Sequence, residues 1–141
     1  MEYKITIHDE SETIELAENF ESEKFPNMVI CLNGDLGSGK TKFTEGFLSF
    51  FGLNDEISSP TFTIVNEYCK EDINIYHFDV YRLEDLDEFY AIGGPEYFDK
   101  GICLIEWGEL IEPILSKYIK ISILKDNNDV NVRYITVDNI G

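Results

Sequence analysis

The feature that most constrains this chain is the segment 34–41, which reads Gly-Asp-Leu-Gly-Ser-Gly-Lys-Thr and fills the pattern G-x-x-x-x-G-K-[ST]. Its glycines allow the backbone to adopt positive φ and to approach an anion without a Cβ in the way. Successive N–H groups and the N-terminus of a following helix can then surround a phosphate. The pattern therefore predicts a site for a nucleoside triphosphate, with a flexible Gly-rich turn and an unrelated lysine as the alternative.

The positions of this loop have distinct expected roles. Lys40 would reach the β- and γ-phosphates, and the Thr41 hydroxyl would coordinate Mg²⁺. The residues that we expect to contact the nucleotide are Asp35, Leu36, Gly37, Ser38, Gly39, Lys40, Thr41 and Lys42.

The segments on either side of the loop support this prediction. Residues 28–32 read Met-Val-Ile-Cys-Leu, a continuous apolar run typical of a strand buried on both faces. After the loop, phenylalanines follow at i, i+4, i+7 and i+8, the apolar stripe of an amphipathic helix: Phe43, Phe47, Phe50 and Phe51. The loop is therefore expected between a buried strand and a helix, where a phosphate site requires it.

The rest of the chain alternates strand and helix patterns. Residues 3–7 alternate as a half-buried strand does, and Asp9 with Glu12 resembles a capping box at the start of a helix. Strands are expected over 62–69, 73–81 and 102–107. The apolar residues from Leu83 to Tyr90 have helical spacing, and Pro113 limits the helix after the last of these strands to a short piece. Residues 119–134 predict an antiparallel hairpin with an Asx-rich turn. We expect an α/β fold, a P-loop NTPase-like mixed sheet flanked by helices with a C-terminal antiparallel hairpin, as one domain over 1–141.

The net charge and the cysteines restrict the partners and the cellular compartment that we expect. The net charge is −17 with only eleven Lys and Arg, so the surface repels nucleic acid, and RNA or DNA would have to be held by a more basic partner. Acidity that serves only solubility is the alternative. Cys31, Cys69 and Cys103 are expected to be buried free thiols of a cytosolic protein, and no apolar stretch is long enough to span a membrane.

Two acids at strand ends are candidates to complete the site. Asp79 follows the run 75–78, and Glu106 follows the apolar run 102–105. Ligands gather at the carboxyl ends of parallel strands, so both acids can face the same Mg²⁺ and γ-phosphate. Asp79 would hold the metal or its waters, and Glu106 would orient or deprotonate the attacking water and stand near the metal. Solvated acids at strand ends are the alternative.

Other residues carry weaker signals. Thr61 is expected either to sense the γ-phosphate in a switch loop or simply to begin a strand. Arg82 would clamp phosphate or a partner, or form an ordinary surface ion pair. Trp107 adjoins Glu106, although a core indole is the more common role. His77 favours a hydrogen-bonded core residue over a catalyst.

Several segments together resemble one family. They are residues 34–41, Ser-Ser-Pro-Thr-Phe-Thr-Ile-Val-Asn-Glu-Tyr (58–68), Tyr-His-Phe-Asp-Val-Tyr-Arg-Leu (76–83) and Leu-Ile-Glu-Trp-Gly-Glu (104–109). In this order they resemble the TsaE (YjeE) family, small bacterial ATPases of tRNA threonylcarbamoyladenosine biosynthesis. Ser38, where family members often carry Ala, is a small-for-small difference.

The resemblance implies an ATPase with ATP and Mg²⁺ as cofactors and the TsaD–TsaB complex as partner. That complex modifies the adenosine beside the tRNA anticodon, and tRNA would be held by the partners. By the same resemblance Lys40 binds phosphate, Thr41 and Asp79 serve Mg²⁺, Glu106 and Trp107 line the site, and Thr61 lies in a switch-like segment. A cytoplasmic location follows.

Other nucleotide-binding classes fit less well. A small P-loop kinase usually brings several arginines to its acceptor site, and this chain has two. A GTPase would carry an Asn-Lys-x-Asp motif, which is absent from the sequence. A nucleotide-gated binding switch with little turnover of its own stays open.

Overall fold

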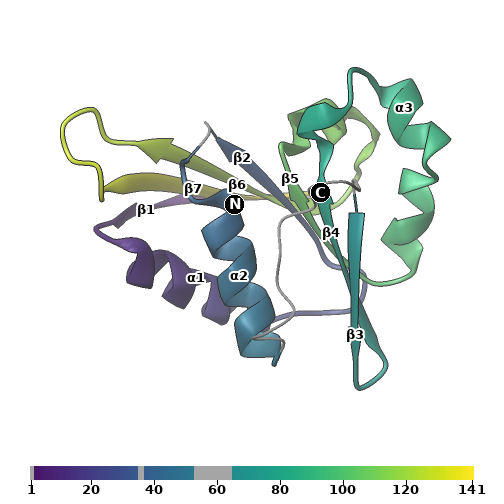
Figure 1. Cartoon of the computed structure of the whole chain (residues 1–141), viewed down its shortest axis with the longest axis horizontal. Helices are drawn as coiled ribbons and strands as arrows, with labels where there is room; N and C mark the ends of the chain where they lie inside the picture. Colours follow the sequence, from purple (N-terminus) through teal and green to yellow (C-terminus); the bar gives the residue numbers. More distant parts are fainter. Residues whose placement is uncertain (1, 35–36, 53–64) are drawn as a thin grey trace.

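A computed structural model describes residues 2–34, 37–52 and 65–141, and shows a seven-stranded mixed sheet with helices on both faces (Figure 1). The strands lie in the order β1-β7-β6-β2-β5-β4-β3. The helices and strands are β1 (Glu2–Ile7), α1 (Glu10–Ser22), β2 (Val29–Gly34), α2 (Lys40–Phe51), β3 (Val65–Lys70), β4 (Ile73–Asp79), α3 (Leu86–Ala91), β5 (Ile102–Glu106), β6 (Tyr118–Lys125) and β7 (Arg133–Ile140). Short 3-10 turns occur at η1 (Val80–Arg82), η2 (Gly94–Asp99), η3 (Gly108–Leu110) and η4 (Glu112–Ile114). The predicted α/β fold with a mixed sheet is confirmed.

The strand before the loop, β2, occupies the middle of the sheet. It runs parallel to β5 on one side and to β6 on the other, and β4 runs parallel to β5. Met28, Ile30 and Leu32 pack into the core shared with α1 and α2, whereas Val29 and Cys31 pack into the core on the other face. This burial on both faces is what the continuous apolar run predicted.

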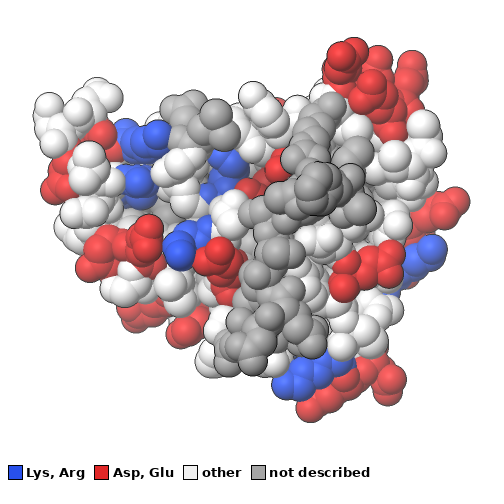
Figure 2. Space-filling model, in the orientation of Figure 1, with Lys and Arg blue, Asp and Glu red and all other residues white. Residues whose placement is uncertain are grey.

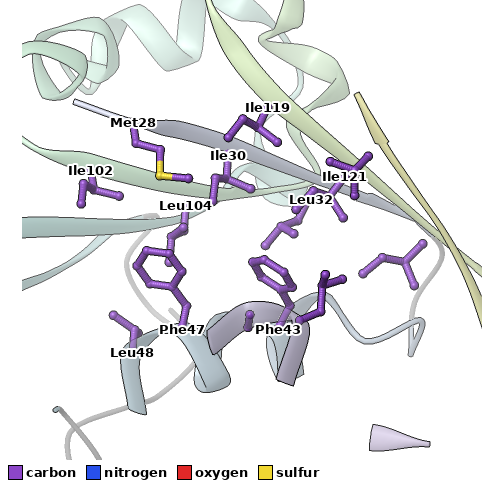
Figure 3. Close-up of a cluster of buried hydrophobic side chains, with 14 of the residues drawn as sticks. Met28, Ile30, Leu32, Phe43, Phe47, Leu48, Ile102, Leu104, Ile119 and Ile121 are labelled. Atoms are coloured by element: carbon purple, nitrogen blue, oxygen red, sulfur yellow. The ribbon is translucent and has the colours of Figure 1, made fainter. Parts of the chain in front are cut away.

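Helix α2 directs its aromatic side chains against the sheet. Phe43 and Phe47 are fully buried and point toward Ile30, Leu32 and Leu104 (Figure 3). Phe51, in the last turn, also packs against this core, whereas Phe50 departs from the predicted stripe and is 53% exposed. Helix periodicity places a residue on a face but does not show how far that face is covered.

The close approach of α1 to α2 depends on a glycine. A Cβ added at Gly46 would lie 3.1 Å from the Ala17 Cβ and 3.1 Å from the Ile14 Cα. Helix α1 begins as expected at Asp9, whose carboxylate accepts from the Glu12 backbone N–H at 3.1 Å. The α1–α2 pair thus covers the face of the sheet beside the phosphate loop (Figure 1).

The C-terminal hairpin has a wider turn than the sequence suggested. Strand β7 begins at Arg133, and Val130 lies in the turn with 81% of its surface exposed. The alternating apolar residues Val130 and Val132, which the hairpin pattern over 119–134 predicts on the second strand, therefore lie outside it. The Asp126 carboxylate accepts from the backbone N–H groups of Asn128 and Asp129 at 2.9 and 2.8 Å. These side-chain contacts satisfy backbone N–H groups of the turn, in place of the hydrogen bonds that strand pairing would supply.

Two further expectations need correction. Strand β4 ends at Asp79 rather than Tyr81, because the Asp79 carboxylate accepts from the Tyr81 N–H and starts η1. Cys69 is exposed, whereas Cys31 and Cys103 are buried, and burial raises the pKa of Cys103 to about 12. Within the part of the chain that the structure describes, no helix is long and apolar enough to cross a membrane.

Candidate functional site

The phosphate loop connects the end of β2 to the start of α2, at the edge where β4 and β5 also end. A cavity of about 310 Å³ opens beside it, lined by Glu10, Gly37, Gly39, Lys40, Thr41, Lys42, Asp79, Glu106 and Trp107. Most of the predicted site residues therefore line one hollow. Asp35 and Leu36 lie outside the described residues.

Glycines give the loop its shape. Gly37 and Gly39 have φ of 76° and 119°, in the region that favours glycine. A Cβ on Gly34 would lie 2.4 Å from the Ile123 carbonyl oxygen of β6, so only glycine at this position lets β2 approach β6 so closely. A Cβ at Gly39 would meet nothing within 4 Å, so this position opens onto free space.

Lys40 is buried and folded back onto its own loop. Its Nζ donates to the Gly34 carbonyl oxygen at 2.6 Å and lies 3.9 Å from the centroid of the Trp107 ring. The Ser38 hydroxyl is 3.5 Å from the same ammonium. The cation is thus beside the cavity, held by a carbonyl and an aromatic face.

Glu106 is joined directly to the loop. The Thr41 hydroxyl donates to Glu106 Oε1 at 2.9 Å, and the carboxylate is buried. Asp79 lies beside Glu106, since the two residues are register partners at the ends of β4 and β5. The two acids therefore lie at the same corner of the sheet, next to the phosphate loop.

His77 supports Glu106 from within the sheet. The buried imidazole donates through Nε2 to Glu106 Oε2, and within the described part of the chain its Nδ1 has no hydrogen-bond partner. His77 is thus a hydrogen-bonded core residue, the role that the sequence favoured, but its partner is the candidate catalytic acid. Its place two residues before Asp79 on a buried strand was the signal that linked it to the site.

Trp107 lines the cavity and also packs, half-buried, against the core on the α3 face of the sheet. Its backbone is left-handed (φ 63°), and its N–H donates to the Leu32 carbonyl at 2.9 Å. The indole lies between Lys40 and the Tyr81 ring, whose centroid is 4.8 Å away. The indole therefore combines both roles, since it packs against the core and also lines the cavity.

Cationic side chains gather around the loop of this acidic protein. Figure 2 shows Lys and Arg atoms close together on the face that carries the start of α2 and the hairpin. Arg133 Nε donates to the Ser38 carbonyl at 2.9 Å, and a Cβ built at Gly37 would be 3.3 Å from Lys125 Nζ. No sequence pattern predicted a role for Arg133 in the site. Its scarcity, as one of two arginines, was the available signal.

Two candidate switch or partner residues stay untested. Thr61 lies outside the described residues. Arg82 lies in η1 close after Asp79, and its side chain is likewise outside the description.

The donor set at the cavity suits a hard cation. It consists of hydroxyl and carboxylate oxygens, the ligands that Mg²⁺ prefers. Among the described residues no group of three or more His, Cys, Asp and Glu side chains is placed to hold a metal. A Mg²⁺ ion here would therefore take further ligands from phosphate and water.

Comparison with known proteins gives a consistent picture. The family model of "Threonylcarbamoyl adenosine biosynthesis protein TsaE" matches residues 7–135. The chain is 39% identical over 126 residues to the tRNA threonylcarbamoyladenosine biosynthesis protein TsaE of Rickettsia typhi, covering 87% of this chain and 88% of that protein. It is 44% identical over 117 residues to the protein of the same name from Bacillus subtilis, covering 82% of this chain and 72% of that protein. The crystal structure of Bacillus subtilis YdiB superposes with a TM-score of 0.78 at 36% identity, covering 100% of this chain and 87% of that chain.

Proposed function

Because this chain belongs to the TsaE family of threonylcarbamoyl adenosine biosynthesis proteins, we propose that it binds ATP and Mg²⁺ at residues 37–42 and hydrolyses the ATP. Its role in tRNA threonylcarbamoyladenosine biosynthesis comes with the family. In this proposal, hydrolysis supports the TsaD–TsaB complex, which modifies the adenosine beside the anticodon. In the same proposal the protein works in the cytoplasm, where the tRNA that the partner complex modifies is found.

One observation carries the proposal. The hydroxyl of Thr41 contacts the buried carboxylate of Glu106, with Asp79 alongside and Lys40 at the same cavity. A phosphate loop together with a carboxylate at the end of a neighbouring strand is the arrangement that phosphoryl transfer requires. The open space at Gly39 leaves room for phosphate.

The side chains divide the work as follows. Lys40 binds the terminal phosphates after leaving the Gly34 carbonyl and the Trp107 ring. Thr41 and Asp79, with Glu106 beside them, hold Mg²⁺, which neutralises charge on the phosphate oxygens. Glu106 also orients the attacking water and accepts its proton, while His77 fixes the direction of the carboxylate.

A nucleotide-gated switch with little turnover of its own is the second candidate. In either candidate, the Lys40 ammonium would exchange its contacts with the Gly34 carbonyl and the Trp107 ring for phosphate. In both readings nucleotide binding precedes any action on the partner complex. They differ in whether the partner complex raises the rate of ATP hydrolysis or only binds the nucleotide-loaded protein.

Measured ATP hydrolysis separates the candidates. We expect Mg²⁺-dependent release of phosphate that rises when TsaD–TsaB is added, whereas a pure switch would show nucleotide-dependent capture by TsaD–TsaB without added turnover. Lys40→Ala should abolish ATP binding, and Asp79→Ala should abolish Mg²⁺-dependent turnover. Transfer of the phosphoryl group to a small acceptor in place of water would contradict the proposal.

A further inference from the structure

Arg133 joins the C-terminal hairpin to the phosphate loop from 95 residues away in sequence. Its Nε donates to the Ser38 carbonyl at 2.9 Å, and its Nη2 donates to the Gly37 carbonyl at 3.3 Å. The remaining edge of the guanidinium donates to the carbonyls of Val130 and Val132 at 2.6 and 2.9 Å. One planar cation therefore binds the hairpin turn and two consecutive peptide groups of the loop.

These contacts fix the direction of loop N–H groups. A trans peptide unit is rigid, so the C=O of one residue and the N–H of the next point in opposite directions. Holding the Gly37 and Ser38 carbonyls turns the N–H groups of Ser38 and Gly39 away from the guanidinium. Arg133 does not line the candidate nucleotide cavity but a second hollow that also contains Gly37, Ser38 and Gly39.

We propose that Arg133 is a positioning residue that turns the loop carbonyls outward, so that the loop N–H groups stay directed at the nucleotide phosphates. This inference rests on the proposed function, since it assigns a means of nucleotide binding. A carbonyl oxygen that turned inward would repel phosphate, and the guanidinium fork prevents that rotation at two adjacent positions.

The position of the hairpin makes this contact specific. Arg133 is the register partner of Lys125 across β6 and β7, and Lys125 Nζ lies against Gly37. Strand β6 also pairs with β2, where Ile123 is opposite Gly34. The hairpin is therefore anchored to the strand that leads into the loop and touches the loop again beyond it.

Three variants test the proposal: Arg133→Gln, Arg133→Lys and Tyr134→Phe. Tyr134→Phe is the matched control, because it removes a hairpin-turn hydrogen bond to Asp126 at 2.5 Å without touching the loop. The first readout is amide hydrogen exchange of residues 37–44 without nucleotide. The second is the Kd for Mg²⁺-ATP, followed by the fluorescence of Trp107, the only tryptophan in the chain.

We expect Arg133→Gln to exchange faster over residues 37–44 and to bind Mg²⁺-ATP about tenfold more weakly, as loss of charge-assisted hydrogen bonds predicts. Arg133→Lys should also bind more weakly, since an ammonium lacks the fork that holds two carbonyls. Tyr134→Phe should match the wild type in both readouts. Thermal unfolding of each variant shows whether the fold is retained.

Three results would overturn the inference. The first is an Arg133→Gln variant whose residues 37–44 exchange amide hydrogens at the wild-type rate. The second is an Arg133→Lys variant that binds Mg²⁺-ATP with the wild-type Kd. The third is a Tyr134→Phe variant that behaves like Arg133→Gln. If the wild type itself binds no nucleotide, the proposed function fails. The exchange comparison still decides whether Arg133 orders the loop, because it is made without nucleotide.

Discussion

At the scale of single residues, Glu106 is where the contacts of the site converge. One carboxylate oxygen receives the Thr41 hydroxyl and the other receives the His77 imidazole. Both oxygens are therefore fixed in direction before any ligand arrives, and a group positioned in this way needs little reorganisation when charge develops nearby. The same contacts explain how an acid can be kept buried on an apolar strand.

Replacing Glu106 should separate binding from hydrolysis. Glu106→Gln keeps the shape and one acceptor oxygen but removes the base, so we expect a near-normal Kd for ATP and a kcat lower by about 10²-fold or more. Single-turnover hydrolysis in the presence of TsaD–TsaB measures this. Glu109→Gln, an exposed acid three residues later, is the control and should keep the wild-type rate. An unchanged kcat in Glu106→Gln would remove Glu106 from the mechanism.

At the scale of elements, the unit from β2 through the loop to α2 could be predicted from sequence because its signals are local. A continuous apolar run, a glycine-rich loop and a helical phenylalanine stripe each follow from neighbouring residues. The contacts of Arg133 with the loop could not be predicted, because they depend on how a distant hairpin pairs in the sheet. The exposure of Phe50 and the wide hairpin turn were missed for a related reason, since tertiary packing and Asx contacts override local alternation.

The α2 stripe gives an element-scale prediction. Phe47→Ala should lower the free energy of unfolding by about 3–5 kcal/mol, since it leaves a cavity against the sheet. Phe50→Ala, in the same helix but half-exposed, should cost less than about 1 kcal/mol. Urea unfolding followed by circular dichroism measures both. Equal losses would show that Phe50 is covered in solution.

The start of α1 predicts a dependence of stability on pH. Hydrogen bonds from the Ser11 hydroxyl and the Glu12 N–H hold the pKa of Asp9 below its usual value. The charged cap therefore stabilises the fold above about pH 4, and this contribution is lost as pH falls through the lowered pKa of the folded state. Asp9→Asn keeps a capping oxygen without the charge. We expect urea unfolding to show that the wild type is more stable than Asp9→Asn at pH 7 and that this difference disappears in acid. A stability difference that stays constant with pH would contradict this role.

At the scale of the whole molecule, charge is unevenly placed. The chain carries −17 overall, yet Lys40, Lys42, Lys125 and Arg133 gather around one loop. Figure 2 shows Lys and Arg atoms close together on that face of the molecule. Such a distribution favours a small, highly charged anion at that place and disfavours an extended polyanion over the remaining surface. The charge therefore supports a nucleotide site and an indirect relation to tRNA.

The net charge predicts that the protein does not bind tRNA by itself. At about 0.15 M salt, where only close charges act strongly, the chain alone should not bind tRNA at micromolar concentration. Its mixture with TsaD–TsaB should bind tRNA through the partners. Fluorescence anisotropy of labelled tRNA tests both cases. Micromolar binding by the chain alone would show a direct contact that net charge does not reveal.

The central position of β2 also sets the order in which this protein can mature during synthesis. Ile30 pairs with Leu104 on one side and with Ile119 on the other, so the strand emerges from the ribosome long before either neighbour exists. Sheets built from such distant pairings form slowly. A nascent chain therefore displays the whole glycine-rich motif well before the neighbouring strands β5 and β6 have been synthesised. On the proposed function, the nucleotide site would be complete only when the sheet closes around β2, so unfinished chains would neither sequester ATP nor engage partners prematurely.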